Sequence, residues 1–171
     1  MRRLIILGAG GFGQTVGDLA RQSGKYKDVC FLDDGKVGSE ILGKVADYTK
    51  FKSEETEMIP ALGNNELRLK LAQKIESVGI VLATIVHASA YVSPTAEIAA
   101  GTVVLPMALI NTHCKVGRAC IINCGAMIDH GCVIEDGVQL CIGAAIKAEN
   151  RIAALSKIEA CQVIESRTFP V

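Results

Sequence analysis

The sequence predicts an α/β unit over residues 1–84, followed by a parallel β-helix over residues 85–171. Three observations support this division. A glycine-rich turn joins an apolar segment to an amphipathic one near the N-terminus. After residue 85, an aliphatic residue recurs at every sixth position. Aromatic residues make up only 4% of the chain, and none lies between residues 92 and 168. The second core must therefore be narrow and filled by aliphatic and small side chains.

The N-terminal unit begins with a predicted strand over residues 4–7, a glycine turn and a helix. Gly8, Gly10 and Gly13 satisfy the pattern G-x-G-x-x-G, which is typical of nucleotide-binding turns. A second apolar strand ends in Asp33 and Asp34, about 20 residues beyond this turn, where ribose-binding acids occur in such folds. The order of elements therefore predicts a Rossmann-like unit with a parallel sheet.

A second segment with the order strand, turn and helix is predicted in residues 59–79. We expect a strand ending at Gly63 and a helix capped by Asn64, with Leu67, Leu71 and Ile75 on its apolar face. Because only about 84 residues precede the repeats, the unit is a half domain, and a full dinucleotide fold needs two halves. We expect it to hold one nucleotide's phosphates at its first helix N-terminus. A dinucleotide site and glycines that serve packing alone are the alternatives.

The second half divides into fourteen hexads from Ile85 onwards. Their second positions are all aliphatic, and their sixth positions are nearly all small. A period of six fits neither a helix nor an alternating strand, but it fits a three-sided coil of short strands that stacks on its neighbours. Three hexads give a coil of 18 residues and nearly five coils. The last glycine is Gly143, so we expect the final coils to be irregular or built on different turns.

Composition narrows the function. The chain is 50% hydrophobic with 18 basic and 18 acidic residues and no basic tract, so we expect a packed protein without nucleic-acid partners. No run approaches the about 20 apolar residues of a membrane span. The four apolar residues before Gly8 are too few for a secretory signal, so we expect no membrane partner and a cytoplasmic location. The seven cysteines match no zinc or redox spacing and are expected to be reduced and buried.

This combination resembles the family of sialic acid O-acetyltransferases and UDP-amino-sugar N-acetyltransferases. The resemblance spans the chain and is carried by GAGGFG (8–13), FLDD (31–34), LGNNELRLKL (62–71), IVHASAYVSPTA (85–96) and INCGAMIDHGCVIEDG (122–137). It implies left-handed coils and a homotrimer. It also implies acetyl-CoA bound between neighbouring β-helices and a sugar nucleotide held by the N-terminal unit.

The resemblance also implies site residues. His130 matches the catalytic base, and Asn123 matches an active-site asparagine. The expected sugar-nucleotide contacts are Gly10, Gly11, Phe12, Asp33, Asp34, Gly63 and Asn64, and the expected CoA contacts are Gln139 and Ala148. Three positions depart from the family. Gly131 stands where an acid often follows the histidine, Gln139 replaces a second histidine, and Phe12 replaces a histidine of the glycine turn.

The predicted reaction is direct transfer of an acetyl group from acetyl-CoA to a nucleotide-linked amino sugar, or to a sialic acid hydroxyl, without a metal. A histidine side chain, with an unperturbed pKa of about 6.5, suits proton removal from the acceptor at neutral pH. Asp129, Glu135 and Asp136 are candidates for orienting it. The first alternative is a catalytically degenerate sugar-nucleotide-binding or scaffold relative. The second is a zinc enzyme using His87, His113 and His130, although the chain has no His-x4-His pair.

Overall fold

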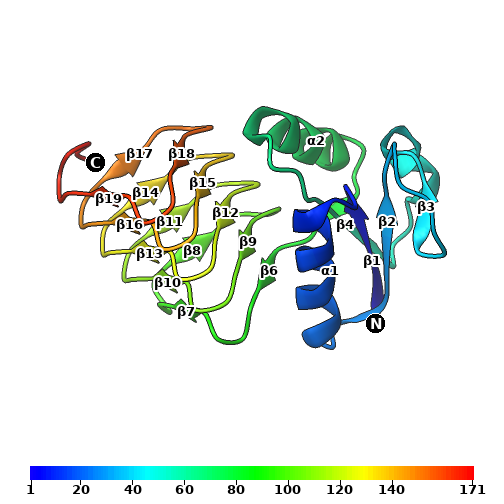
Figure 1. The fold of residues 1–171 in the computed structure, drawn as a ribbon, viewed down its shortest axis with the longest axis horizontal. Helices are drawn as coiled ribbons and strands as arrows, with labels where there is room; N and C mark the ends of the chain where they lie inside the picture. Colours follow the sequence, from blue (N-terminus) through cyan, green and yellow to red (C-terminus); the bar gives the residue numbers. More distant parts are fainter. The chain divides into compact units, whose positions relative to one another are not determined.

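A computed structural model describes all residues, 1–171, as two compact units. Unit 1 comprises Met1–Ile85 and unit 2 comprises Val86–Val171 (Figure 1).

Unit 1 is a five-stranded parallel sheet with the strand order β3-β2-β1-β4-β5. Its elements are β1 (Arg2–Leu7), α1 (Gly11–Gln22), β2 (Tyr26–Leu32), β3 (Ile41–Gly43), the 3-10 helix η1 (Val45–Phe51), β4 (Thr56–Pro60), α2 (Asn65–Ser77) and β5 (Val81–Leu82). Helix α1 packs on β1 and β2, and α2 packs on β4 and β5. The chain reverses its direction of travel across the sheet between β1 and β4. In open α/β sheets, ligands bind at the carboxyl ends of the strands at such a switch point. The predicted Rossmann-like fold is therefore confirmed.

Two details of unit 1 differ from the sequence prediction. Strand β4 ends at Pro60 rather than Gly63, because residues 61–64 form the turn that leads into α2. Asn64 caps this helix as predicted, since its Oδ1 accepts a hydrogen bond from Leu67 N at 2.9 Å. Leu67 itself is 48% exposed, so its predicted place on the buried face is wrong. Arg68 is buried instead, and its guanidinium donates to Leu62 O at 2.9 Å.

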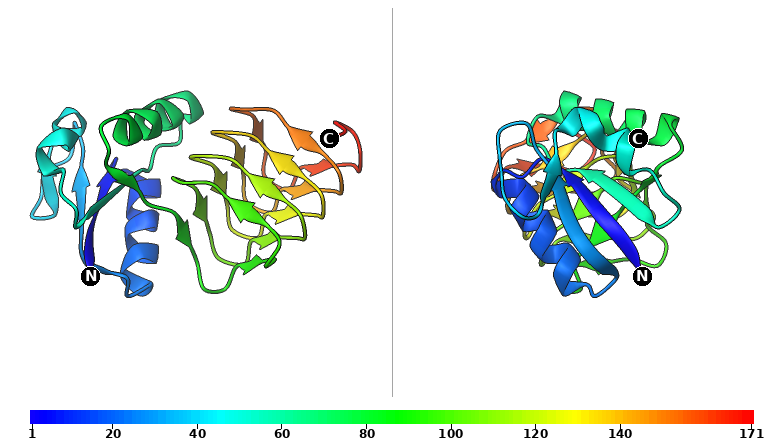
Figure 2. Two further views of the ribbon diagram at one scale, coloured as in Figure 1. Left: turned by 180° about the vertical axis from the view of Figure 1, so that it is seen from behind. Right: turned by 90° about the vertical axis from the view of Figure 1, so that its right-hand side faces the viewer.

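Unit 2 carries the predicted parallel β-helix, which is left-handed as in the family that the sequence resembles. Its strands pair with the strand 18 residues further on, for example Ile110 with Ile128, so each coil has 18 residues (Figure 2). Three parallel sheets result, with the strand orders β19-β16-β13-β10-β7, β17-β14-β11-β8 and β18-β15-β12-β9-β6. The strands are β6 (Ile85–Val86), β7 (Tyr91–Val92), β8 (Glu97–Ile98), β9 (Val103–Val104), β10 (Leu109–Ile110), β11 (Lys115–Val116), β12 (Ile121–Ile122), β13 (Met127–Ile128), β14 (Val133–Ile134), β15 (Gln139–Leu140), β16 (Ala145–Ile146), β17 (Arg151–Ile152), β18 (Lys157–Ile158) and β19 (Val163–Ile164).

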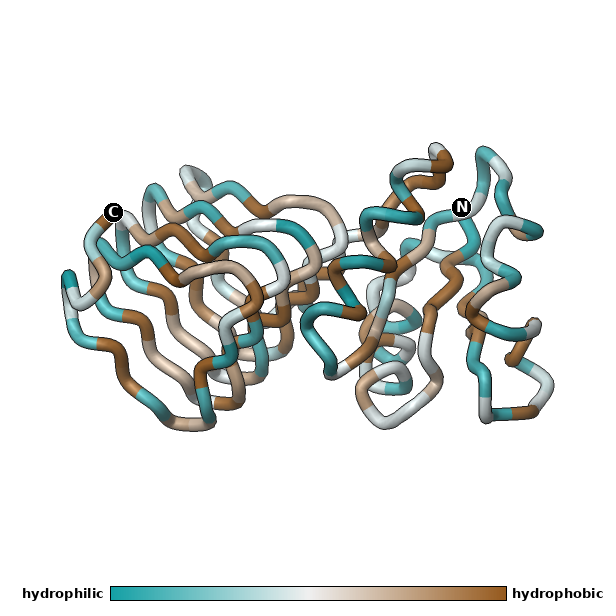
Figure 3. Tube along the Cα trace, turned by 90° about the horizontal axis from the view of Figure 1, so that it is seen from above, coloured by the Kyte–Doolittle hydropathy of each residue, from teal (hydrophilic) through white to brown (hydrophobic).

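The core of unit 2 consists of the second and sixth residues of the hexads. One continuous cluster runs from Val104 to Ile164, with aliphatic second positions and small sixth positions such as Ala126. Apolar and polar stretches alternate along each coil in Figure 3. Burial of one aliphatic side chain stabilises each strand by about 1.5–3 kcal/mol. Because the small sixth residues keep the core narrow, these aliphatic side chains fill it without aromatic residues.

The corners do not change in the last coils, so the expectation of irregular or different turns is wrong. The fifth residue of the hexad has positive φ in the glycine corners, as at Gly125 (+64°), and equally in the glycine-free ones, as at Leu155 (+63°). This conformation costs a non-glycine residue roughly 1–2 kcal/mol. It points the corner N–H along the stack, so that Leu155 N donates to Asp136 O at 2.9 Å in the coil before it. These inter-coil hydrogen bonds hold the strained corners in place.

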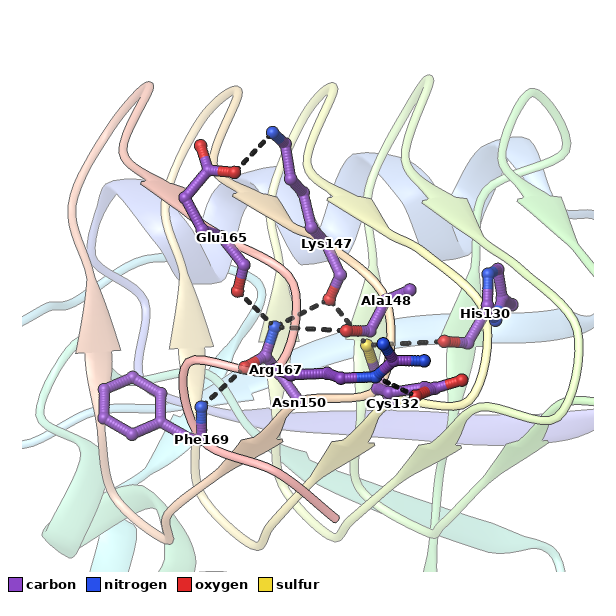
Figure 4. A network of polar contacts seen from close by, with 9 residues as sticks. His130, Cys132, Lys147, Ala148, Asn150, Glu165, Arg167 and Phe169 are labelled. Carbon is purple, nitrogen blue, oxygen red and sulfur yellow. Dashed lines mark hydrogen bonds and ion pairs between the residues drawn. The ribbon is translucent and has the colours of Figure 1, made fainter.

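Polar sixth residues donate hydrogen bonds to carbonyl groups in the next coil. Cys114 Sγ donates to Asp129 O at 3.0 Å, and Cys132 Sγ donates to Lys147 O at 3.2 Å. Asn150 replaces cysteine one coil later, and its Nδ2 donates to Glu165 O at 2.8 Å (Figure 4). These two cysteines and Cys120 are buried, as predicted, and their thiols also satisfy corner carbonyls. The prediction is wrong for the other four, because Cys161 is exposed and three cysteines outside the sixth positions are partly exposed, namely Cys30, Cys124 and Cys141.

Candidate functional site

The glycine turn of unit 1 contains two glycines that are fixed by local geometry. Gly8 has a φ of +105°, and a Cβ there would lie 2.9 Å from Ala61 O. A Cβ on Gly13 would lie 2.0 Å from Gly8 O, because α1 begins directly against β1. Both positions therefore need glycine for the fold itself, whatever the turn binds.

Gly10, Gly11 and Gly63 have no such local reason. A Cβ at any of the three would meet no protein atom within 4 Å, and none of them has positive φ. All three lie on the turns after β1 and β4, at the switch point of the sheet. Gly10 is the N-cap of α1 and offers no capping side chain, so first-turn N–H groups, which include those of Gly11 and Phe12, remain available to an anion. The open space suits the close approach of a phosphate to the backbone.

Asp33 fixes the turn from the end of β2. Its Oδ2 accepts from Ala9 N at 2.7 Å, and its Oδ1 accepts from the backbone N–H groups of Gly35 and Lys36 at 2.9 and 2.8 Å. The hydrogen bond from Ala9 N, with those from the next turn, lowers the pKa of this carboxyl group. Asp33 is thus fully engaged within the protein. Asp34 accepts only one hydrogen bond, from Val45 N at 3.0 Å.

Two hollows of about 450 and 380 Å³ flank the loop after Asp34. Ala9 and Gln14 line the first hollow, Asp33 and Asp34 line the second, and Lys36 lines both. An ammonium group beside a helix N-terminus adds positive charge for a phosphate. The capping side chain of Asn64 lies on the opposite turn, where it is occupied by Leu67 N.

His130 lies on the corner between β13 and β14 and is exposed. Thr112 and Ala148 occupy the equivalent positions of the coils on either side. Neither ring nitrogen of His130 has a hydrogen-bond partner in the chain. In Figure 4 the dashed line at this residue ends on its carbonyl oxygen, which accepts from Glu149 N at 3.1 Å. The imidazole is therefore free to act on a group that approaches from outside.

The three acids predicted as candidates for orienting His130 have other partners. Asp129 Oδ1 accepts from Asn111 Nδ2 at 3.2 Å and from the backbone N of His130 at 2.7 Å. Glu135 pairs with Arg151 at 2.9 Å, and this pair lowers the pKa of its carboxyl group. Asp136 Oδ1 accepts from Arg118 N at 2.8 Å. Each of them stabilises a corner rather than the imidazole.

Asn123 and Gln139 lie away from His130 within one chain. Asn123 follows β12 and His130 follows β13, so the two occupy different edges of the three-sided coil. Gln139 opens β15, which pairs with β12 in the sheet that Asn123 follows, and its Oε1 is buried without a hydrogen-bond partner. Of the predicted residues in unit 2, only Ala148 stacks directly on the His130 column.

The sheet that ends at the His130 edge has an apolar outer face. We call its outward residues the apolar ladder; they are Tyr91, Leu109, Met127, Ala145 and Val163, paired strand to strand. Tyr91, Met127 and Val163 are about half exposed, at 53%, 46% and 49%. The equivalent residues of the next sheet include Glu97, Lys115 and Arg151. Sequence reasoning missed this ladder, although the first position of every third hexad carries it.

No group of three His, Cys, Asp or Glu side chains is arranged to hold a metal ion. Neither α-helix is both long enough and apolar enough to cross a membrane.

Known proteins resemble this chain in both units. Residues 3–75 match the family described as PglD N-terminal domain. The acetyltransferase domain of PglB from Neisseria gonorrhoeae is 29% identical with a TM-score of 0.94, over 98% of this chain and 84% of that one. A GDP-perosamine N-acetyltransferase variant from Caulobacter crescentus is 21% identical with a TM-score of 0.77, over 97% and 90%. WeeI from Acinetobacter baumannii is 22% identical with a TM-score of 0.73, over 93% and 81%.

The PglB match extends through both units. The segments that carried the predicted resemblance include the switch-point turns of unit 1 and the corner of the coil that holds His130. The two solved structures that are less than 25% identical agree with it in fold. Residues 3–75 therefore match the PglD N-terminal domain family, and the chain as a whole is similar to the PglB acetyltransferase domain.

Proposed function

We propose that this protein is an acetyl-CoA-dependent acetyltransferase that acetylates the amine of a nucleotide-linked amino sugar. The observation that carries the proposal is the match to the PglB acetyltransferase domain over 98% of the chain, a domain also solved with acetyl coenzyme A. The Caulobacter relative was solved with CoA and GDP-perosamine, a nucleotide-linked sugar. Transfer to a sialic acid hydroxyl is the second acceptor class that the family contains.

His130 would act as the general base. As the acceptor nitrogen attacks the thioester carbonyl carbon, the imidazole takes its proton, and the sulfur of CoA leaves as a thiolate. A positioned base of this kind contributes about 10²–10⁴-fold to rate. The transient oxyanion needs a hydrogen-bond donor, for which the Asn123 amide is our candidate.

A homotrimer would bring these residues together. Within one chain, His130 and Asn123 lie at opposite ends of β13, and the apolar ladder crosses that strand at Met127. Burying the ladder against a neighbouring copy would remove about half-exposed apolar side chains from water. It would also lay the His130 edge of one copy beside the Asn123 edge of the next. We place CoA in that seam, with Ala148 beside His130 and with Gln139 on the sheet that ends at the Asn123 edge.

Unit 1 would hold the nucleotide of the acceptor. We assign the phosphates to the N–H groups at Gly10, Gly11 and Phe12, with Gly63 leaving room on the opposite turn. Asp34, which keeps more acceptor capacity than Asp33, is the better candidate for a ribose or base contact. Uridine diphosphate is the expected nucleotide. We also propose a cytoplasmic location, which all seven cysteines, being free, support.

The test is release of CoA from acetyl-CoA with a panel of UDP- and GDP-linked amino sugars and free sialic acid. We expect one amino-sugar nucleotide to support turnover and His130→Ala to lower kcat about 10²–10⁴-fold. His113→Ala is the matched control, because His113 is also an exposed corner imidazole, and it should stay near wild type. A wild-type protein as idle as His130→Ala, yet able to bind a sugar nucleotide, would support the scaffold alternative. Bound zinc with chelator-sensitive activity would support the zinc alternative.

A further inference from the structure

The position after the histidine, where the family often carries an acid, is left open by Gly131. Glu149 is 18 residues later and occupies the same corner position in the next coil. Its Cγ lies 3.4 Å from where a Cβ of Gly131 would be, so its side chain extends over the glycine. Its backbone N donates to His130 O at 3.1 Å. The glutamate therefore fills the space in which the missing side chain would stand.

The Glu149 carboxylate has one oxygen held and one free. Oε2 accepts from Arg167 Nε at 2.6 Å, and Arg167 is the corner residue of the following coil. No hydrogen bond within the chain uses Oε1. The Arg167 guanidinium, and to a lesser degree the positive charge of a protonated His130, lower the pKa of the Glu149 carboxyl group. Glu149 is thus an anion at neutral pH and lies within electrostatic range of the imidazole.

The other charged groups around this corner are already satisfied or have the wrong sign. Asp129 accepts from Asn111 and from the His130 backbone. Lys147 pairs with Glu165 at 2.5 Å on the adjoining position of the coil (Figure 4). His113 lies one coil below Gly131 and carries no negative charge. Asp129 Oδ2 is also unused, but its Oδ1 is held by the backbone N of His130 and by Asn111. Glu149 keeps Oε1 free, and its side chain extends over Gly131, the residue after the histidine.

We propose that Glu149 is a positioning residue that orients the His130 imidazole through its free carboxylate oxygen, in place of the acid that Gly131 lacks. Arg167 holds the other carboxylate oxygen of Glu149. The three side chains, His130, Glu149 and Arg167, therefore come from three successive coils and lie along one edge of the coil. The proposal rests on the proposed function of His130. It differs from the family arrangement because the acid comes from the next coil and not from the next residue.

The first test is Glu149→Gln, which keeps the shape and removes the charge. Because orientation supplies part of the about 10²–10⁴-fold effect of a general base, we expect kcat to fall about tenfold with little change in KM. The low-pH limb of the kcat/KM profile should move to lower pH, since the carboxylate no longer stabilises the protonated imidazole. The double variant Glu149→Ala/Gly131→Asp removes the longer side chain and restores an acid at the family position, and Asp tolerates positive φ. It should recover most of kcat.

Glu165→Gln is the matched control, because it breaks an equivalent ion pair between successive coils, with Lys147. It should leave kcat and the pH profile as in wild type. The ¹⁵N chemical shifts of the His130 ring, recorded on the full chain, report its tautomer without any need for turnover. They should change in Glu149→Gln and not in Glu165→Gln. Unchanged ring shifts, or an unchanged pH profile in an active Glu149→Gln, would overturn the proposal. Ring shifts that respond in an enzyme without turnover would overturn the proposed function alone.

Discussion

Gly13 in unit 1 and Gly125 in unit 2 differ in what surrounds them. A Cβ on Gly13 would lie 2.0 Å from Gly8 O, whereas a Cβ on Gly125 would meet nothing within 4 Å. Gly125 instead has a φ of +64°, and Gly13 does not have positive φ. Gly13 is therefore required because there is no room for a side chain, and Gly125 is favoured because the backbone is left-handed there. Gly10, Gly11 and Gly63 show neither reason, so the proposed nucleotide site is the role that remains to be tested at these positions.

The two units also build their sites by different rules. In unit 1, the turn after β1 is fixed by Asp33, which follows β2, and by Ala61 and Leu62, which follow β4 and are far away in sequence. In unit 2, every neighbour of His130 follows from one spacing, since the pairing joins residue i to residue i+18. Substitutions in unit 1 should therefore act across strands, and substitutions in unit 2 should act along a column.

The largest expected effect is that of Gly13→Ala. The added methyl group would overlap the Gly8 carbonyl, which belongs to the backbone and cannot move without displacing β1 or α1. We expect the free energy of unfolding of unit 1 to fall by at least about 3 kcal/mol. Chemical denaturation followed by circular dichroism would measure the loss.

Gly10→Ala is the matched variant within the same turn. It adds the same methyl group where no protein atom lies within 4 Å and where φ is −71°, so stability should change by less than about 1 kcal/mol. Its affinity for a sugar nucleotide, measured by calorimetry, should nevertheless fall at least about tenfold, which corresponds to about 1.4 kcal/mol. Unchanged binding by Gly10→Ala would show that this glycine does not serve a ligand.

An intermediate effect is expected for Asp33→Asn. One side of the amide must present N–H₂ to a backbone N–H donor, so at least one of the three hydrogen bonds to Asp33 is lost. We expect the free energy of unfolding to fall by about 1–2 kcal/mol at pH 7. Denaturation curves of both proteins across pH would measure the difference.

The pH dependence of that difference follows from the lowered pKa of Asp33, which arises mainly from the Ala9 N–H. A carboxyl group with a depressed folded-state pKa stabilises the fold fully above its unfolded pKa of about 3.9. The advantage of wild type over Asp33→Asn should be constant above about pH 5 and should shrink as pH falls below about 4. An advantage at pH 3 as large as that at pH 7 would contradict this assignment.

The sequence predicted unit 2 in more detail than unit 1, for a physical reason. A single inward aliphatic residue per hexad defines strand, register and coil at once, so Val104 and Ile164 were predictable as core. In unit 1, the end of β4 and the buried face of α2 depend on contacts between distant segments. Arg68 displaced Leu67 from that face because its guanidinium caps the Leu62 carbonyl, which helical periodicity does not reveal.

The site followed the same pattern. The 18-residue spacing identified Thr112 and Ala148 as neighbours of His130, and it also placed Glu149 above Gly131. That second stack was not predicted, because the acids considered were those close to His130 in sequence. The separation of Asn123 from His130 could also have been predicted, because one predicted strand, now β13, lies between the two corners that carry them. To predict the apolar ladder, one has to compare the first positions of every third hexad, because those hexads lie in the same sheet and share one face of the coil.

The smallest expected effects compare two corners of one column. Gly125 and Cys161 occupy equivalent positions two coils apart, with φ of +64° and +58°. Gly125→Ala should destabilise unit 2 by about 1 kcal/mol, because the methyl group meets no atom and only the left-handed backbone is penalised. Cys161→Gly should do the reverse and stabilise by about 0.5 kcal/mol, since glycine relieves the corner but gains entropy in the unfolded chain. Urea unfolding at a constant m value would measure both. If both substitutions were neutral, stacking hydrogen bonds rather than residue type would set the stability of these corners, and the absence of glycine after Gly143 would carry no cost.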